Sequence, residues 1–385
     1  MTLEALGADK CYLYFSTPWL NVNATKTLTC NSSSKTWDYK INGASFDVST
    51  DADLTCTVTK TAASTSQTFA QYIASLAGTT QGTGQVVNEN GYRYEGKDPN
   101  NYIWFNNEMW RIIGVFGSSR HGVTNDPKTI NSVSDTYLVK IIRNSPLSKY
   151  AWNAKSGASN NWPTSSLYYL LNGCYFYALN ATDTTNISGS SVACSNYCIC
   201  NFYSSTINPR THCDFRVLGL QKTDKYFGYR DMVQEATWYL GGSGKTGYDD
   251  TYPADVYGYE TNSNAIYSGN STSITANVGL MYVSDYGYSV LASSCARGSN
   301  DMFSDYKSES CSGNSWLFSQ GDEWTISHYS SGNYASWYLD DGYIGNKGCV
   351  DGNIVRPVVY LKSKTYKLAG NGSVTNPYVI GMTAG

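Results

Sequence analysis

The sequence carries little charge and has no long apolar run. Only 15% of its 385 residues are Asp, Glu, Lys or Arg, well below the usual share of about a quarter. The net charge is −3, and Lys and Arg do not cluster. Because phosphate binding needs clustered cations, we expect no nucleic-acid partner. No stretch approaches the roughly 18 apolar residues of a membrane-spanning helix, so we expect no membrane insertion within this chain.

Histidine is scarce, and familiar catalytic motifs are missing. None of the three histidines, His121, His212 and His328, lies in a Gly-x-Ser-x-Gly or Cys/His setting. A glycoside hydrolase needs two facing carboxylates. Glu108 and Asp285 are candidates for that pair, but their spacing in the sequence gives no support for this assignment. We therefore predict that the chain is not an enzyme.

Tyrosine, by contrast, is abundant. The chain contains 34 Tyr and 10 Trp, with much Ser, Thr, Asn and Gly. Such residues make an uncharged, aromatic, hydrogen-bonding surface, which suits contact with a glycan or a protein because Tyr offers a large area at low entropic cost. The alternative is a coding bias towards Asn and Tyr combined with an extracellular location.

Cysteine use indicates an oxidising compartment. Eleven cysteines are many for a cytosolic protein and ordinary for an exported one. The odd number requires at least one thiol that is free or paired between molecules. One cluster offers zinc ligands, namely Cys194, Cys198, Cys200, His212 and Cys213. Its spacing is unusual for a zinc site, so we favour two disulfides that close a loop.

The C-terminal stretch 324–361 predicts three short strands. Its apolar runs are separated by Gly- and Asp-rich turns, and Asp341-Gly342 is a strong hairpin signal. The run 354–361 is apolar enough to be a buried central strand. Pro357 lies inside this run and lacks the N–H that a ladder requires, so we expect a bulge there or a position facing away from a neighbour.

Several segments together resemble a known fold, the C-type-lectin-like domain. They are residues 102–116, 278–288, 314–317 and 355–361. The sequences of these segments resemble those of uncharacterised surface proteins of gut Firmicutes. The resemblance extends from about Thr68 to the C-terminus. The same fold hosts a Cys-dependent formylglycine-generating activity, but Cys295 and Cys349 do not reproduce its paired-cysteine context.

We expect a mainly β chain with a few helices (α+β) and two domains. Residues 1–66 contain five strand-like runs, at 11–15, 25–30, 36–41, 44–48 and 54–58, and we expect a small Ig-like β-sandwich stalk. Cys30 and Cys56 would form one disulfide. Residues 67–385 would form the C-type-lectin-like head, with polar insertions. In the head, helices are predicted at 69–77, 165–172 and 231–240, strands at 102–105, 109–116, 137–143 and 278–284, and a last hairpin at 365–380.

The resemblance implies that the ligand face surrounds the C-terminal hairpin. The candidate ligand-binding residues there are Tyr329, Asn333, Tyr334, Trp337, Tyr338, Tyr343 and Asn346. The competing interpretation is that Trp337 and Tyr343 point inward and fill the core. C-type lectins hold sugars through Ca²⁺, but the Glu-Pro-Asn and Trp-Asn-Asp motifs are absent, so we predict no cofactor. Calcium remains the alternative, at Asp249, Asp250, Asp340, Asp341, Asp351 and Asn353.

Together these features favour an extracellular or cell-surface binding protein of a Gram-positive gut bacterium. It would act as an adhesin that recognises a glycan or a surface protein. The alternative is a structural subunit of an extracellular, pilus-like filament that associates with itself. Mature pilins begin Phe- or Met-Thr-Leu-x-Glu before a long apolar helix. Residues 1–4 echo that start with the acid one place early, but the helix is absent. No signal peptide is visible, so we expect a processed or truncated product that lacks an N-terminal anchor.

Overall fold

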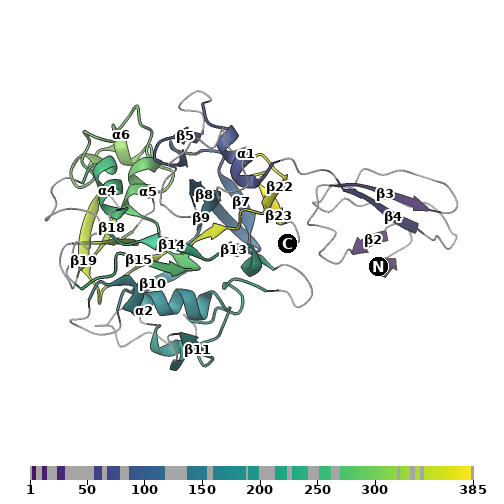
Figure 1. Cartoon of the computed structure of the whole chain (residues 1–385), viewed down its shortest axis with the longest axis horizontal. Helices are drawn as coiled ribbons and strands as arrows, with labels where there is room; N and C mark the ends of the chain where they lie inside the picture. The colour runs from purple at the N-terminus through teal and green to yellow at the C-terminus, as the bar shows by residue number, and fades with distance from the viewer. Residues whose placement is uncertain are drawn as a thin grey trace.

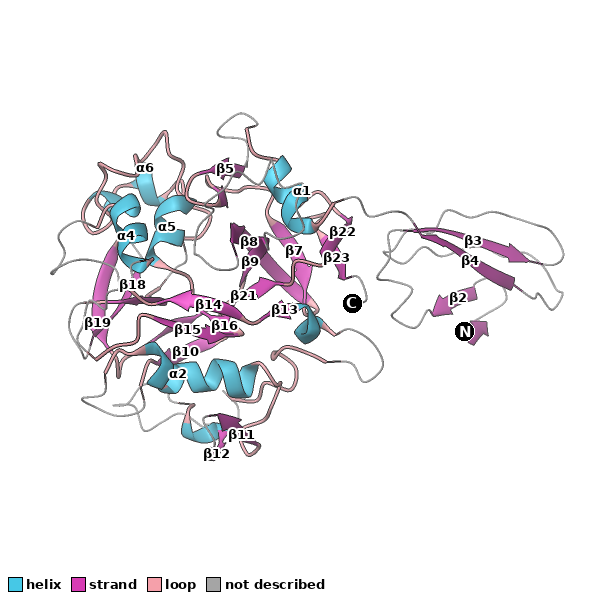
Figure 2. Cartoon of the chain, viewed as in Figure 1, coloured by secondary structure: helices cyan, strands magenta, loops and turns pink. Residues whose placement is uncertain are grey.

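The chain is described by a computed structural model (Figure 1). The described residues are 2–5, 11–14, 24–30, 56–62, 67–78, 86–117, 137–153, 159–187, 190–198, 213–222, 228–241, 251–261, 269–318, 321–329, 334–338 and 342–382. The part from residue 67 onward is called the C-terminal region below. As Figure 2 shows, strands run through the middle of this region and helices lie around them. The fold is mainly β with few helices, as the sequence predicts.

The first 62 residues contribute four strands, described by their backbone. β1 (Thr2–Ala5) pairs with β2 (Cys11–Tyr14), and β3 (Ala24–Cys30) pairs with β4 (Cys56–Ala62), both antiparallel. The runs predicted at 36–41 and 44–48 lie outside the described residues. Cys30 and Cys56 are directly opposite in the β3–β4 register, and the disulfide between them stays a prediction.

An eight-stranded sheet forms the larger part of the core. Its main path is β13-β21-β9-β8-β6-β5, with β16 beside β21 and β7 beside β8. The strands are β5 (Val86–Asn88), β6 (Tyr92–Tyr94), β7 (Tyr102–Phe105), β8 (Glu108–Gly117), β9 (Tyr137–Arg143), β13 (Val233–Gln234), β16 (Val278–Gly279) and β21 (Val358–Leu361). Every residue of β9 and β21 is buried, as expected for apolar strands in the middle of a covered sheet.

The hairpin predicted around Asn106-Asn107 is confirmed. β7 pairs antiparallel with β8, and both turn residues have positive φ, 55° and 60°. Asn tolerates this left-handed conformation better than most residues, which is why this turn was readable from the sequence. β8 then pairs with β9, the strand predicted beside it.

A five-stranded sheet carries the C-terminal hairpin. Its order is β10-β20-β17-β18-β19, and its strands are β10 (Ser148–Ala151), β17 (Glu323–His328), β18 (Tyr334–Tyr338), β19 (Ile344–Gly348) and β20 (Gly352–Val355). Gly342 lies in the turn between β18 and β19 with φ +82°, a conformation open to glycine at little cost. The predicted hairpin is therefore confirmed.

Pro357 marks the point where the chain leaves one sheet for the other. The predicted single strand 354–361 is interrupted at Arg356 and Pro357, so that β20 belongs to the five-stranded sheet and β21 to the eight-stranded sheet. Arg356 is buried; its Nε donates to Glu323 Oε1 and its Nη2 to the carbonyl of Leu317. The proline thus ends one ladder, as its missing N–H requires.

Helices cover the sheets. α1 (Phe69–Ser75) confirms the first predicted helix and begins with a Thr68–Gln71 capping box. α2 (Ser166–Tyr169) confirms the second and continues as a π-helix, η4 (Leu170–Tyr175). In Figure 1, α2 lies at one end of the C-terminal region, and α4 (Pro253–Glu260), α5 (Val283–Ser289) and α6 (Glu309–Ser312) lie at another. The shorter helical turns are η3 (Trp162–Thr164), η5 (Cys194–Asn196), η6 (Tyr229–Met232) and η7 (Asp305–Lys307).

Two predicted elements are wrong. The helix predicted at 231–240 contains β13 and β14 (Ala236–Tyr239) instead, and β14 pairs with β15 (Ser273–Ala276). Burial alternates along β14, so Ala236 and Trp238 point into the core with a period of two. The strand predicted at 278–284 ends at Gly279, because Asp285 accepts from the N–H of Tyr282 and begins helix α5.

Two further hairpins are present, of which the sequence predicts the first. The last hairpin is β22 (Thr365–Ala369) with β23 (Val379–Met382), and a further hairpin pairs β11 (Thr184–Ile187) with β12 (Ser190–Ala193). The described part of the chain contains the disulfides Cys174–Cys194, Cys198–Cys213 and Cys295–Cys311. Cys174–Cys194 and Cys198–Cys213 close loops of the Cys-rich insertion, so these cysteines form disulfides, as favoured from the sequence, and not a zinc site. The disulfides indicate folding outside the reducing cytosol.

Candidate functional site

The predicted ligand-binding residues occupy β17–β19 and the segments beside them. Tyr329, Tyr343 and Asn346 are half-buried. Three further residues, Tyr334, Trp337 and Tyr338, lie on β18, which is described by its backbone; Asn333 lies outside the described residues. The register places Asn346 opposite Ser336, and Trp337 opposite both Trp324 and Gly345. Successive pairs of the ladder face opposite sides of the sheet, so Trp337 and Asn346 lie on different faces, and the grouping of the predicted set into one binding face stays a prediction.

The structure describes both side chains of one aromatic pair at the start of β19. The rings of Tyr343 and Phe303 meet edge to face, with 6.0 Å between their centroids. The Nζ of Lys307 lies 4.2 Å from the centre of the Tyr343 ring and 5.2 Å from that of Phe303. Both rings are half-buried and Lys307 is exposed. We call these three residues the aromatic platform.

Strand β19 ends the five-stranded sheet within the described ranges. It pairs with β18 on one side, and the sheet order continues no further. Lys347 lies in the half-buried part of β19. It pairs with Asp322 at 2.9 Å, and the two side chains are 35% and 30% exposed. A charged lysine on an outer strand discourages uncontrolled pairing with other chains.

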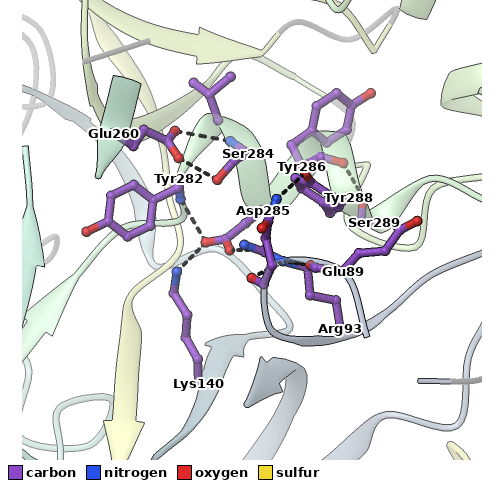
Figure 3. Close-up of polar contacts among 12 residues, drawn as sticks. Glu89, Arg93, Lys140, Glu260, Tyr282, Ser284, Asp285, Tyr286, Tyr288 and Ser289 are labelled. Atoms are coloured by element: carbon purple, nitrogen blue, oxygen red, sulfur yellow. Dashed lines mark hydrogen bonds and ion pairs between the residues drawn. The ribbon is translucent and has the colours of Figure 1, made fainter. Parts of the chain in front are cut away.

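A second candidate site is buried. Arg93 of β6, Lys140 of β9 and Asp285 of α5 meet in a charge cluster that Figure 3 shows. Arg93 Nη1 donates to Asp285 Oδ1 at 2.9 Å, and Lys140 Nζ donates to Asp285 Oδ2. All three side chains are at most 1% exposed. Such charges persist inside a protein only when they are paired and hydrogen-bonded.

Local structure positions each member of this cluster. Asp285 is the third residue of α5, so its carboxylate turns back to cap the helix at the N–H of Tyr282. Arg93 is held by the carbonyls of Glu89 and Asn90, which accept from its Nε. Strand β6 passes β8 at Gly114, where an added Cβ would lie 2.2 Å from the carbonyl oxygen of Tyr92. Glycine there allows β6 to approach β8 closely.

Aromatic rings enclose Lys140. Its Nζ lies 4.3 Å from the ring centre of Tyr282, and 5.2 to 5.8 Å from those of Phe116, Tyr360 and Trp238. Burial lowers the pKa of Lys140 to about 8, against the opposing effect of Asp285. Removal from water therefore outweighs the attraction of the carboxylate.

Glu260 is a second buried acid, and it lies beside the start of α5. Its carboxylate accepts from the backbone N–H of Ser284 at 3.1 Å, from the Ser284 hydroxyl, and from the Ser327 hydroxyl at 2.6 Å. Burial raises the pKa of Glu260 to about 7, although these hydrogen bonds act in the opposite direction. The acid is therefore poised between its two protonation states near neutral pH.

Arg297 extends the cluster towards the surface. Its guanidinium pairs with Glu95 at 2.9 Å and Glu89 at 3.0 Å. The ring of Tyr288 lies between Arg93 and Arg297, at 4.6 and 5.2 Å from their guanidinium carbons. Because Arg stacks well on aromatic faces, Tyr288 separates two cations that would otherwise repel each other.

The nominated hydrolytic pair does not form a reaction site. Glu108 is bound by Arg143, through contacts of 2.6 to 2.8 Å, and by the indole N–H of Trp110. Asp285 is occupied by Arg93 and Lys140. His328 is buried, and burial lowers its pKa to about 4. His121 and His212 lie outside the described residues.

Two of the calcium candidates, Asp351 and Asn353, lie within the described residues. Asn353 is fully buried in β20, and Asp351 is half-buried in the preceding turn. The others, Asp249, Asp250, Asp340 and Asp341, are not described. Within the described ranges, no group of three or more His, Cys, Asp or Glu side chains is placed to hold a metal ion.

Neither Lys140 nor Glu260 is among the site residues that the sequence predicts. A signal for Lys140 was present, because it is a single cation within the apolar run 137–142, all of which is buried. Its partner Asp285 is 145 positions away, a distance that no local pattern spans. Glu260 ends α4 in a polar stretch, and nothing in its neighbourhood distinguishes it from a surface acid.

Comparison with known proteins gives no family assignment: no family model, curated protein or solved structure matches the chain. None of the helices that the structure describes is long and apolar enough to cross a membrane.

Proposed function

We propose that the chain is an extracellular surface-binding protein of the adhesin type. In this proposal the C-terminal region is a C-type-lectin-like head, and residues 1–66 form a small β-sandwich stalk. The ligand is a glycan or a surface protein, bound at the side of the head formed by β18, β19 and the aromatic platform.

The observation that carries this proposal is the aromatic platform. Half-buried rings with an exposed lysine beside them offer apolar area, π-faces and a hydrogen-bond donor at one place. Asn346, three positions after Tyr343 and on β19, adds a half-buried amide to the same part of the sheet. These are the properties of surfaces that bind neutral polar ligands with little conformational change.

A glycan array with the purified chain tests this function. We expect selective binding that falls at least about tenfold in Tyr343→Ala and Lys307→Ala, which corresponds to about 1.4 kcal/mol. The matched control is Trp104→Ala, which removes an exposed aromatic side chain on β7. Equal losses in all three variants, or no binding to glycans or to surface proteins, would overturn the proposal.

The filament alternative has one observation in its favour. β19 ends its sheet among the described strands, and an outer strand can accept a strand from another copy. Light scattering after size-exclusion chromatography distinguishes the two functions: a 42.3 kDa monomer supports the binding head, and large assemblies support the filament. The free thiol of Cys349 is buried, so an assembly that reductant dissolves must be joined through another cysteine.

A further inference from the structure

Lys140 and Asp285 meet where no water reaches. Both side chains are 0% exposed, and the Nζ of Lys140 contacts Oδ2 of Asp285 directly. One lies on β9 and the other at the start of α5, 145 positions apart. Folding therefore holds an amine and a carboxyl group together at a very high effective concentration.

The surroundings of Lys140 disfavour its charged form. Four aromatic rings lie within 6 Å of the Lys140 Nζ. In such a site, transfer of one proton from the ammonium to the carboxylate replaces two buried charges with two neutral groups. The lowered pKa of Lys140, about 8, agrees with this tendency. A neutral lysine is a nucleophile, and a neutral carboxyl group is an electrophile.

We propose that Lys140 and Asp285 are joined by an intramolecular amide bond that forms within the folded protein.

The reaction balances without any other reagent. A proton moves from Nζ to Oδ2 along the existing contact, and the Nζ lone pair then attacks Cγ of Asp285. A second proton passes from nitrogen to Oδ2, the Cγ–Oδ2 bond breaks, and one water molecule leaves. The product is a secondary amide, and no atom is oxidised or reduced.

Arg93 is positioned to assist the attack. Its Nη1 donates to Oδ1 at 2.9 Å, and Oδ1 is the oxygen on which negative charge develops when Nζ adds to Cγ. A fixed cation in a site without water stabilises such an oxyanion strongly. Oδ1 becomes the amide carbonyl and can keep the same donor, so the contact survives the reaction.

The chain contains a matched pair that should not react. Lys347 and Asp322 are 2.9 Å apart, but both are about one-third exposed. Water stabilises the charges of both groups, which disfavours proton transfer between them. The pair has the same functional groups and a similar contact, and it differs in burial.

Mass spectrometry of the reduced and alkylated intact chain tests the proposal. We expect the wild-type mass to be lower than the sequence mass by one water molecule. A tryptic digest should contain a branched peptide that links Lys140 to Asp285, and no branched peptide that contains Lys347. A full sequence mass, or Lys140 recovered only in a linear peptide, would overturn the proposal.

Three variants make the result specific. Lys140→Met should have its full sequence mass, and this measurement remains valid if the variant does not fold. Asp285→Asn can form the same amide with loss of ammonia instead of water, so its product should have the same mass as the cross-linked wild type. Lys347→Met should still lose one water molecule. Loss of water in Lys140→Met would show that the bond lies elsewhere and would contradict the assignment.

Discussion

At the scale of single residues, Asp285 has more than one role. Its carboxylate caps α5 at the N–H of Tyr282, and it also receives Arg93 from β6 and Lys140 from β9. One side chain thus fixes the start of a helix against two strands of the sheet. Because the group is buried, the loss of any of these partners leaves another unsatisfied.

Replacement of Asp285 by alanine should destabilise the chain severely. We expect the free energy of unfolding to fall by about 3–5 kcal/mol, because Arg93 and Lys140 both lose the buried side chain that they share. Urea unfolding followed by tryptophan fluorescence measures this change. Asp322→Ala is the control, since it breaks the exposed pair with Lys347 and should change stability by less than about 1 kcal/mol. Similar losses in both variants would contradict the role assigned to burial.

Glu260 and His328 should give opposite pH dependences of stability. The pKa of Glu260 is raised from 4.5 to about 7, so its contribution is complete below pH 4.5 and is lost as the pH rises through 7. The pKa of His328 is lowered from 6.5 to about 4, so its contribution is complete above pH 6.5 and is lost as the pH falls through 4.

Variants should separate these two effects. In Glu260→Gln, we expect stability to rise more steeply with pH between about 4 and 6.5 than in the wild type, because Glu260 no longer opposes the histidine effect and the raised pKa of Glu95 opposes it in part. In His328→Asn, we expect stability to decrease between about 4.5 and 7. Chemical unfolding at a series of pH values checks both slopes against the flatter wild-type profile. Slopes of the same sign in the two variants would show that the groups are not buried as described.

At the scale of elements, the β7–β8 hairpin separates two tryptophans. Trp110 is fully buried and packs edge to face against Phe105 at 5.4 Å, whereas Trp104 is 42% exposed. They occupy adjacent pairs of the ladder, Trp104 with Met109 and Trp110 with Ile103. Since successive side chains alternate between the faces of a sheet, the two rings point to opposite sides.

Alanine at these two positions should have very different effects. Trp110→Ala should cost about 3–5 kcal/mol through the cavity that it leaves, and Trp104→Ala should change stability by about 0.5 kcal/mol or less. Thermal unfolding by circular dichroism gives both values. A large effect at Trp104 would mean that another surface covers it in solution.

The disulfide Cys295–Cys311 closes a 16-residue loop that carries Phe303 and Lys307 of the aromatic platform. Loss of this bridge, in a Cys295→Ser/Cys311→Ser double variant, should lower stability by about 3 kcal/mol, chiefly through the entropy of the unfolded chain. Binding to any ligand found for the platform should weaken as well. A double variant as stable as the wild type would show that the loop is held by packing alone.

Elements that begin or turn at a few characteristic neighbouring residues could be predicted from the sequence. The Asn106-Asn107 turn, the Thr68 cap of α1 and the Gly342 turn each depend on the chemistry of a few neighbouring residues. Short apolar runs fit the periods of both a helix and a strand, so the sequence of 231–240 wrongly predicts a helix. Residues 236–239 form a strand instead because they pair with residues 273–276. The charge cluster depends on contacts 145 and 192 positions apart, which no local pattern contains.

At the scale of the whole molecule, the two sheets share one continuous segment. β20 and β21 are separated only by Arg356 and Pro357, yet each lies in a different sheet. The buried Arg356 also binds Glu323 of β17 and the carbonyl of Leu317. A displacement of either sheet must therefore strain this connection, so we expect the C-terminal region to unfold as one cooperative unit.

The late place of β21 in the chain has a consequence for how the protein is made. β21 fills the position between β9 and β13, but it emerges from the ribosome more than two hundred residues after β9. Until then, the apolar strand Tyr137–Arg143 presents an open edge, and such edges are prone to aggregation. A nascent chain that stops before residue 361 should therefore aggregate unless a chaperone covers the open edge of β9.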